Sequence, residues 1–233
     1  FNQSTLLQMR EEYVRSPDMV GDISYDQHDD TIKNVKFIES GKGKLKWWGK
    51  MGGKRPVQNH NYVIGCDISL GQGQSNSTVS IFDVDTREKV GSWVDSCTMP
   101  ETFAETVYAI GHWVGGMTKV PLLNFENNGI GQVFGKRIRQ LRYPFVYKTT
   151  TEKKGKHEKL STDGWHSSKD TKLELLSNYN AAMSACFSRS KKRKFINPDV
   201  EAIDEAEDYI FSGDKLIPSS SIDAPGGAKA AHG

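Results

Sequence analysis

The sequence predicts an α/β protein in which helices flank a mixed β-sheet. Short apolar, β-branched runs bounded by turn residues predict buried strands at 62–68, 78–84 and 89–95. The short connections between these runs predict an antiparallel meander. After residue 100, helices alternate with strands, and a helical connection between two strands is typical of a crossover to a parallel neighbour. Together these observations predict a partly parallel sheet.

The composition is that of a globular protein with exposed polar segments. Hydrophobic residues make up 36% of the 233 residues, charged residues make up 26%, and the formal net charge is +2. This charge is too small to indicate nucleic-acid binding by itself, but the basic residues are unevenly placed. No apolar run approaches the roughly 18 residues of a membrane span. Cys66, Cys97 and Cys186 fit no zinc spacing, so we expect reduced thiols in a cytosolic protein.

We interpret residues 1–55 as an arm or linker and residues 56–233 as the compact domain. The arm is first acidic, then basic and glycine-rich, with Trp47 and Trp48 as its large apolar anchor. The two tryptophans either pack the arm onto the domain or offer a stacking platform for nucleobases. The acidic residues around His28 either bind a metal or form a solvated loop, and their spacing matches no EF-hand.

The predicted strand 62–68 carries Asp67 within its apolar run, and a loop rich in glycine and serine follows it. An isolated ionised carboxylate in an apolar setting is costly unless it is paired or binds a metal. The alternative is a carboxylate that caps a turn at the end of a strand. A second carboxylate close to Asp67 would favour the metal-binding interpretation.

The second half of the sequence alternates helices with strands. Apolar residues at helical spacing predict a helix at 100–114, on which His112 is expected to be at the surface or hydrogen-bonded in the core. The next strand, at 120–126, ends in Glu126, and a long capped helix is predicted at 169–187. The further predictions are helices at 5–14, 130–141 and 198–211, a strand at 143–149, and a polar connection at 150–167.

Asp67 and Glu126 lie at the ends of two predicted strands, which are neighbours if the fourth strand returns beside the first. The strand order is then 3-2-1-4-5, with the second strand antiparallel. Two carboxylates at short range repel each other unless a divalent cation neutralises them, and oxygen ligands favour Mg²⁺ or Mn²⁺. Two such ions about 3.5–4 Å apart can bind both the attacking water and the leaving oxygen of a phosphodiester displacement. The pair therefore favours metal-dependent phosphodiester hydrolysis.

Four segments of the sequence carry a family resemblance. They are residues 62–83, the turn Phe125-Glu126-Asn127-Asn128-Gly129, residues 164–172, and the closing Ala230-Ala231-His232-Gly233. In this order they resemble the C-terminal nuclease domain of a terminase large subunit, the DNA-packaging motor of tailed bacteriophages. The resemblance covers about residues 45–233. It implies a ribonuclease H-like fold and the cutting of concatemeric double-stranded DNA, with little sequence specificity, during genome packaging.

The resemblance also implies roles for individual residues. Asp67 would be the first-strand ligand and Glu126 the fourth-strand ligand of two Mg²⁺ or Mn²⁺ ions. The family's third acidic residue normally follows a His-Gly pair like His232-Gly233, where this sequence stops. We therefore expect the third ligand just beyond Gly233, with Asp223 as a weaker substitute.

Other positions differ from the family pattern or are open to two interpretations. Asn76 lies in the loop where many relatives carry a further Asp, and it offers an oxygen but no charge, so we expect weak metal affinity. His166 and His232 either lie near the metals or are exposed. The connection 150–167 resembles a hairpin beside the family's active site, or is a solvated basic loop. The lysines implied in DNA binding are Lys153, Lys154, Lys156, Lys159, Lys169 and Lys172.

Three other functions are compatible with the sequence. Residues 65–71 with Ser77-Thr78 resemble the first phosphate-binding loop of an actin-like sugar kinase or ATPase, although the second glycine loop of that family is poorly matched. The chain could also be another ribonuclease H-like nuclease, of the resolvase or transposase type. A non-catalytic module that grips DNA or docks onto a portal is the third possibility.

The sequence has no Walker-type phosphate loop, which a packaging motor needs. In the terminase family this loop lies in a separate N-terminal ATPase domain. The resemblance therefore implies a fragment, in which residues 1–55 are the end of the ATPase domain and the linker. Its implied partners are double-stranded DNA, the ATPase domain, the terminase small subunit and the portal. The resemblance implies no association with a membrane. Its implied location is the host cytoplasm and not the mature virion.

Overall fold

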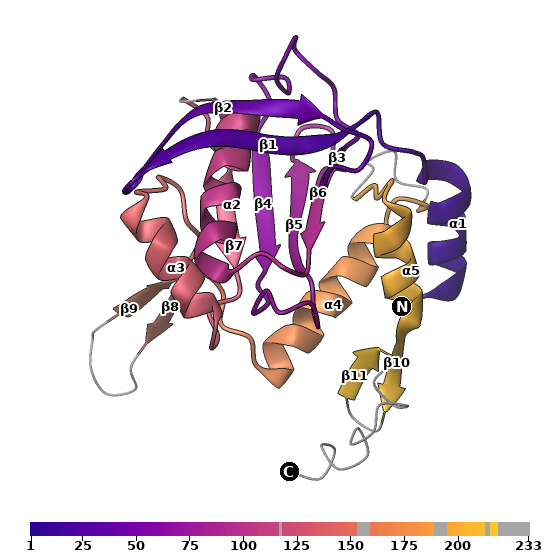
Figure 1. Ribbon diagram of the computed structural model, residues 1–233. Helices are drawn as coiled ribbons and strands as arrows, with labels where there is room; N and C mark the ends of the chain where they lie inside the picture. The colour runs from indigo at the N-terminus through magenta and orange to yellow at the C-terminus, as the bar shows by residue number, and fades with distance from the viewer. Residues whose placement is uncertain (117, 153–158, 189–194, 213–214, 219–233) are drawn as a thin grey trace. The chain divides into compact units, whose positions relative to one another are not determined.

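The computed structural model describes residues 1–116, 118–152, 159–188, 195–212 and 215–218 (Figure 1). The chain divides into two compact units. The larger unit is Pro17–Ser167, and the smaller unit combines Phe1–Ser16 with Ser168–Gly233.

The larger unit is built on one seven-stranded mixed sheet with the order β2-β1-β3-β6-β5-β4-β7. Every neighbouring pair is antiparallel except β4 and β7, which are parallel. The strands are β1 (Met19–His28), β2 (Thr31–Glu39), β3 (Leu45–Trp47), β4 (Tyr62–Asp67), β5 (Ser77–Asp83), β6 (Glu88–Asp95) and β7 (Leu122–Phe125). The predicted meander and the return of the fourth predicted strand beside the first are both confirmed.

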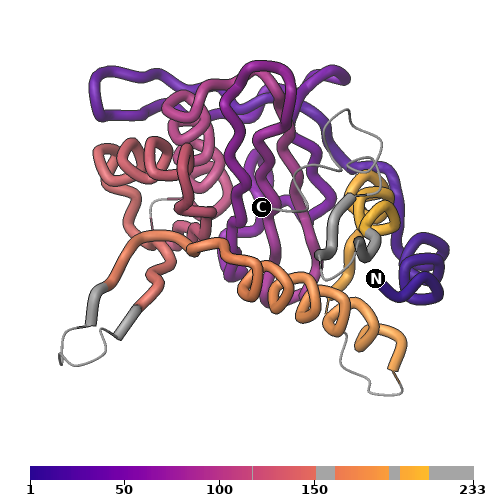
Figure 2. The backbone as a smooth tube through the Cα atoms, turned by 90° about the horizontal axis from the view of Figure 1, so that it is seen from below, coloured from indigo at the N-terminus to yellow at the C-terminus, as the bar shows by residue number. Residues whose placement is uncertain are grey.

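The fifth predicted strand is much shorter than expected. Residue Val146 forms a parallel bridge with Leu123, and the Leu123 amide donates to the carbonyl of Phe145 at 2.8 Å. The chain then leaves the sheet and forms a separate hairpin of β8 (Lys148–Glu152) and β9 (Lys159–Asp163). This hairpin extends away from the sheet (Figure 1, Figure 2).

Residues 19–47 differ from the expected arm, because they form β1, β2 and β3 and extend the sheet beyond β6. Their apolar side chains supply the physical reason. Leu45 and Trp47 are fully buried in the main core, and Ile23, Val35 and Phe37 pack against it. The stacking-platform interpretation of the tryptophans is wrong, because Trp47 is 0% exposed and Trp48 is 4% exposed.

The tip of the β1–β2 ribbon is held by hydrogen bonds and ion pairs around the buried carboxylate of Glu105. Glu105 is 7% exposed, and its carboxylate accepts hydrogen bonds from Gln27 at 2.8 Å and from the Arg137 Nε at 2.9 Å. Arg137 also pairs with Asp30 at 2.5 Å. Burial alone would lower the pKa of Arg137, but its hydrogen bonds to Asp30 and Glu105 outweigh burial and raise it. One of the acidic residues around His28, Asp30, thus forms an ion pair with Arg137.

Two helices cover one face of the sheet. These are α2 (Pro100–Gly115), which begins with proline in its first turn, and α3 (Gly131–Gln140). Alternate residues of β4 are buried, and this matches a strand with one face on the core. The core between strands and helices includes the side chains of Ile64, Val79, Ile81, Phe103, Val107, Ile110, Trp113, Leu123, Phe125 and Phe134.

The smaller unit has its own core. It consists of α1 (Gln3–Tyr13), α4 (Lys169–Ser184), α5 (Val200–Asp208) and the hairpin β10 (Tyr209–Ser212) and β11 (Lys215–Pro218). Its buried hydrophobic cluster consists of Leu6, Met9, Met183, Ile203 and Ala206. The predicted cap of the long helix is confirmed, because Ser168 and Thr171 form a capping box. None of the described helices in either unit is both long and apolar enough to cross a membrane.

The expectation for His112 is wrong in one respect. Its ring is buried at 9% exposure against Tyr108, with ring centroids 4.3 Å apart, and within the described residues neither ring nitrogen has a hydrogen-bond partner. Burial lowers the pKa of His112 below its ordinary value of 6.5. Burial thus disfavours the charged imidazolium in the folded protein.

This burial predicts a pH dependence of stability. Below about pH 6.5 the unfolded chain takes up a proton at His112 that the folded chain binds less readily, so the free energy of unfolding falls as the pH is lowered. His112→Phe keeps an aromatic ring in the cavity and removes the titration. We expect a smaller loss of stability in this variant than in the parent, measured by urea unfolding at about pH 7.5 and 5.5. An equal loss in both proteins would contradict this account of His112.

Candidate active site

Asp67 and Glu126 lie at the same end of two adjacent parallel strands. The β4–β7 register runs from Val63 opposite Leu122 to Cys66 opposite Phe125, and the two carboxylates follow directly after this last pair. Register partners in parallel strands project to the same face of the sheet, and successive residues alternate between faces. Because Cys66 and Phe125 face the core, Asp67 and Glu126 project from the opposite face. The structure thus brings the two predicted acidic residues to one end and one face.

The environments of the two carboxylates differ. Asp67 is exposed at the end of β4, and it is not embedded in the apolar run. Glu126 is half-buried and forms a parallel bridge with Trp165. Cys66 is buried beside Asp67, and burial, with a smaller effect of that carboxylate, raises the pKa of the thiol well above its ordinary value. Cys66 is therefore a core residue and not a candidate nucleophile.

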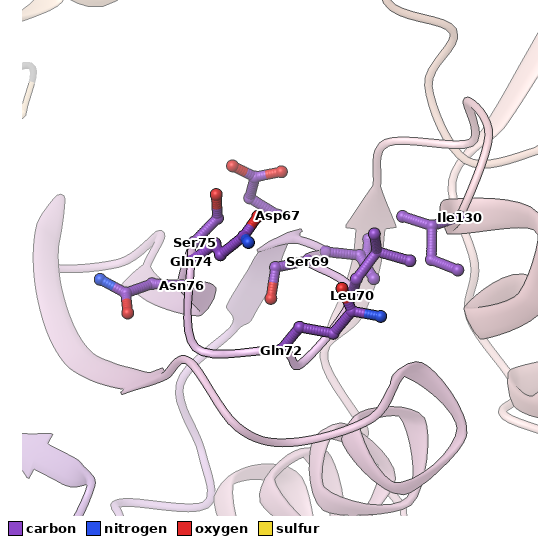
Figure 3. A pocket seen from close by; sticks show the side chains of 9 residues that line it. Asp67, Ser69, Leu70, Gln72, Gln74, Ser75, Asn76 and Ile130 are labelled. Atoms are coloured by element: carbon purple, nitrogen blue, oxygen red, sulfur yellow. The ribbon is translucent and has the colours of Figure 1, made fainter. Parts of the chain in front are cut away.

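A pocket of about 370 Å³ adjoins Asp67. Figure 3 shows the Asp67 carboxylate with the side chains of Gln74 and Ser75 beside it, and Ile130 on another side of the pocket. Asp67 is the one charged side chain among the lining residues, which are Asp67, Ile68, Ser69, Leu70, Gln72, Gln74, Ser75, Asn76 and Ile130. Asn76, which was predicted to offer an oxygen near the metals, thus lines the same pocket as Asp67.

The loop between β4 and β5 is fixed at several points. The Ser69 amide donates to the Ser77 hydroxyl at 3.0 Å, and the Gly73 amide donates to the Ser96 carbonyl at 2.8 Å. Gly71 has φ +72°, and a Cβ there would lie 2.5 Å from the Thr98 carbonyl oxygen. Only glycine fits this close approach and this backbone conformation. The pocket wall is therefore held on a defined frame.

The turn after Glu126 holds the segment that follows β9. The Asn127 amide donates to the Trp165 carbonyl at 2.8 Å. The Asn128 side chain then donates to the Ser167 carbonyl at 2.6 Å and accepts from the Ser167 amide at 2.9 Å. This reciprocal pair mimics two strand-to-strand hydrogen bonds, so it extends the ladder that the Glu126–Trp165 bridge begins. Glu126 is thus flanked by β4 on one edge and by residues 165–167 on the other.

The remaining predicted residues fall into three groups. His166 is exposed and lies one residue after the bridge partner of Glu126. Lys159 is the first residue of β9, while Lys169 and Lys172 belong to the first turn of α4 in the smaller unit. The others lie outside the described residues, and they are Lys153, Lys154, Lys156, Asp223 and His232.

A second group with metal-binding atoms is not apparent from the sequence. Ligand atoms of His60, Asp83 and Asp85 lie within 4.8 Å of one another. Asp83 is opposite Tyr62 at the start of β4, so this group is at the other end of that strand from Asp67. Its atoms are engaged internally, since the Asp83 carboxylate contacts the His60 Nδ1 at 2.6 Å and accepts from the Asp85 amide at 2.9 Å. The predicted pairing of these two strands could have revealed this group, because it places Asp83 opposite the start of β4.

The reciprocal hydrogen bonds between Asn128 and Ser167, which we call the Asn128 clamp, lead to a prediction that does not depend on function. Asn128→Ala removes two hydrogen bonds worth about 1 kcal/mol each, so the amides of residues 165–167 should exchange with deuterium about 30-fold faster. Hydrogen exchange read by mass spectrometry measures this rate. Asn76→Ala, which removes an exposed asparagine from the other wall of the site, is the matched control and should leave these amides protected. If the amides of residues 165–167 exchange equally slowly in Asn128→Ala, the hydrogen bonds of Asn128 do not hold this segment in place.

Comparison with protein-family models and with curated proteins finds no match. Solved structures do match over most of the chain. The large terminase nuclease from thermophilic phage G20c, in a crystal structure with bound cobalt, superposes with a TM-score of 0.54 over 86% of this chain and 83% of that chain. The same nuclease with bound zinc superposes with a TM-score of 0.52 over 90% of each chain. Sequence identity is 14% in both comparisons.

Identity at this level carries information about the fold alone. The mixed sheet, its strand order and the flanking helices agree with the ribonuclease H-like architecture that the sequence predicted. The chain therefore has the ribonuclease H-like fold of a phage large terminase nuclease domain.

Proposed function

We propose that this chain is the metal-dependent endonuclease domain of a viral terminase large subunit. It would cut concatemeric double-stranded DNA during genome packaging, by two-metal phosphodiester hydrolysis and with little sequence specificity. One observation carries the proposal: Asp67 and Glu126 follow the last register pair of adjacent parallel strands and project from the same face. The fold shared with phage terminase nucleases supports the same activity.

The chemistry of the donor set fits a divalent cation. Two carboxylates follow the ends of adjacent strands, and the neutral side chains of Ser75 and Asn76 line the pocket that Asp67 also lines. Such all-oxygen sets suit Mg²⁺ or Mn²⁺. When bound, two ions would polarise the scissile phosphate and lower the pKa of the attacking water. Asp67 and Glu126 would hold them.

The remaining residues would bind and position the substrate. The lysines of the β8–β9 segment and of the first turn of α4 would contact DNA phosphates without reading the sequence. His166, one residue beyond the bridge partner of Glu126, would lie beside the metal ligands. In the full protein the partners would be the ATPase domain, the small subunit and the portal, in the host cytoplasm.

A plasmid-nicking assay with Mg²⁺ or Mn²⁺ tests the assignment. Asp67→Ala and Glu126→Ala should each slow the conversion of supercoiled plasmid about 100-fold, the order expected when a charge-stabilising group is removed from an active site. Asp85→Ala, which removes a carboxylate from the second acidic group, is the matched control and should cut like the parent. If both site variants digest DNA as fast as the parent, the assignment is wrong.

The same preparation distinguishes the other functions. The parent should release no phosphate from ATP, because the sequence has no Walker-type loop. ATP-dependent phosphorylation of a small molecule would instead favour an actin-like sugar kinase. DNA binding without metal-dependent cutting would favour a docking module.

A further inference from the structure

The pocket beside Asp67 has a wall without positive charge. This wall is the loop of residues 68–76, which we call the pocket loop. No Lys, Arg, Asp or Glu occurs between Ile68 and Phe82. The pocket loop instead presents the exposed side chains of Gln72, Gln74, Ser75 and Asn76.

Apolar side chains are exposed at the same place. Leu70 is 53% exposed, and Met99 is 54% exposed. The backbone of Met99 approaches that of Gly71, the residue after Leu70, because a Cβ on Gly71 would lie 2.9 Å from the Met99 amide nitrogen. The half-buried Ile130 lines the pocket as well. The surface next to Asp67 thus combines amides with apolar groups.

The pocket loop presents these groups in a fixed arrangement. Its two ends are joined through Ser69 and Ser77, whose hydroxyl oxygens are 3.1 Å apart. Its middle is held by the hydrogen bond from the Gly73 amide to the Ser96 carbonyl. A surface held in this way loses little conformational entropy on binding, so its contacts can contribute to affinity.

This chemistry does not suit a phosphate. Phosphate contacts that dominate DNA affinity come from Lys and Arg and make binding dependent on salt. Side-chain amides pair with the edges of bases, and in the minor groove they distinguish A·T from G·C pairs. Exposed apolar side chains suit the deoxyribose and the faces of bases. The pocket loop is thus matched to the uncharged part of a nucleic acid.

We propose that the pocket loop contacts base edges and deoxyribose in a groove of the DNA, and so sets which steps are cut preferentially. The proposal rests on the proposed nuclease function, and it adds a weak sequence preference to an otherwise unspecific cut. Cleavage at Asp67 and recognition by the pocket loop are then neighbouring but separable tasks.

A binding experiment tests this proposal without cutting. Fluorescence anisotropy in EDTA measures the Kd of a labelled duplex at several KCl concentrations for the parent and for the triple variant Gln72→Ala, Gln74→Ala, Asn76→Ala. We expect a Kd about 10-fold higher in the variant at every salt concentration. The slope of log Kd against log salt should not change, because no phosphate contact is lost. A Kd within about 2-fold of the parent, or a reduced salt slope, overturns the proposal.

Two controls accompany the triple variant. Gln140→Ala removes an exposed amide from α3 and should leave the Kd unchanged. Lys159→Ala removes a charge from the segment expected to contact phosphates, and it should reduce the salt slope by about 1. Thermal unfolding checks that the triple variant is folded, as expected for three exposed side chains.

Sequencing of cut ends supplies the second measurement. In the parent we expect a bias in base composition next to the cut, and in the triple variant we expect this bias to be flattened. An identical bias in both proteins overturns the proposal. A parent that binds DNA but does not cut it defeats the proposed function instead, and the ratio of Kd values then decides the inference alone.

Discussion

The parallel pairing of β4 with β7 is the constraint on which the candidate site depends. It is the one parallel ladder in the seven-stranded sheet, and it aligns the ends of two strands that are about sixty positions apart in sequence. A shift of one residue in this register would turn one carboxylate toward the core face. The buried side chains of Cys66 and Phe125 oppose such a shift, because each would be exchanged for a polar neighbour. Core packing thus sets the geometry of the acidic pair.

Local sequence patterns were enough to predict the meander, the helices on the core face and the positions of Asp67 and Glu126. Apolar runs such as 62–68 report burial directly, and Pro100 marks a helix start. The strands β1 to β3 were missed because their exposed residues are densely charged and hide the apolar alternation. The tip of the β1–β2 ribbon also contacts Glu105 and Arg137, whose pairing joins two helices that no local pattern connects.

The two carboxylates of the candidate site could be located from the sequence, but the contacts that support the turn after Glu126 could not. Asn128 looked like a turn residue, and its reciprocal hydrogen bonds with Ser167 join positions that lie 39 residues apart. The group of His60, Asp83 and Asp85 was missed for the same reason, since it exists only once β4 and β5 are paired. The burial of His112 without a hydrogen bond follows from packing against Tyr108, which helical spacing alone does not specify. Spacing identifies candidate groups, whereas tertiary structure determines their partners.

The antiparallel hairpins and the parallel β4–β7 ladder are also expected to form at different stages of folding. The hairpins β4–β5 and β5–β6 join residues that are close in sequence, so little chain has to be ordered before they form. The β4–β7 ladder requires the crossover through α2, and the clamp at Asn128 requires the whole β8–β9 hairpin as well. Non-local contacts of this kind slow folding. The acidic pair should accordingly be completed in a late step of folding, after the meander that carries Asp67 has formed.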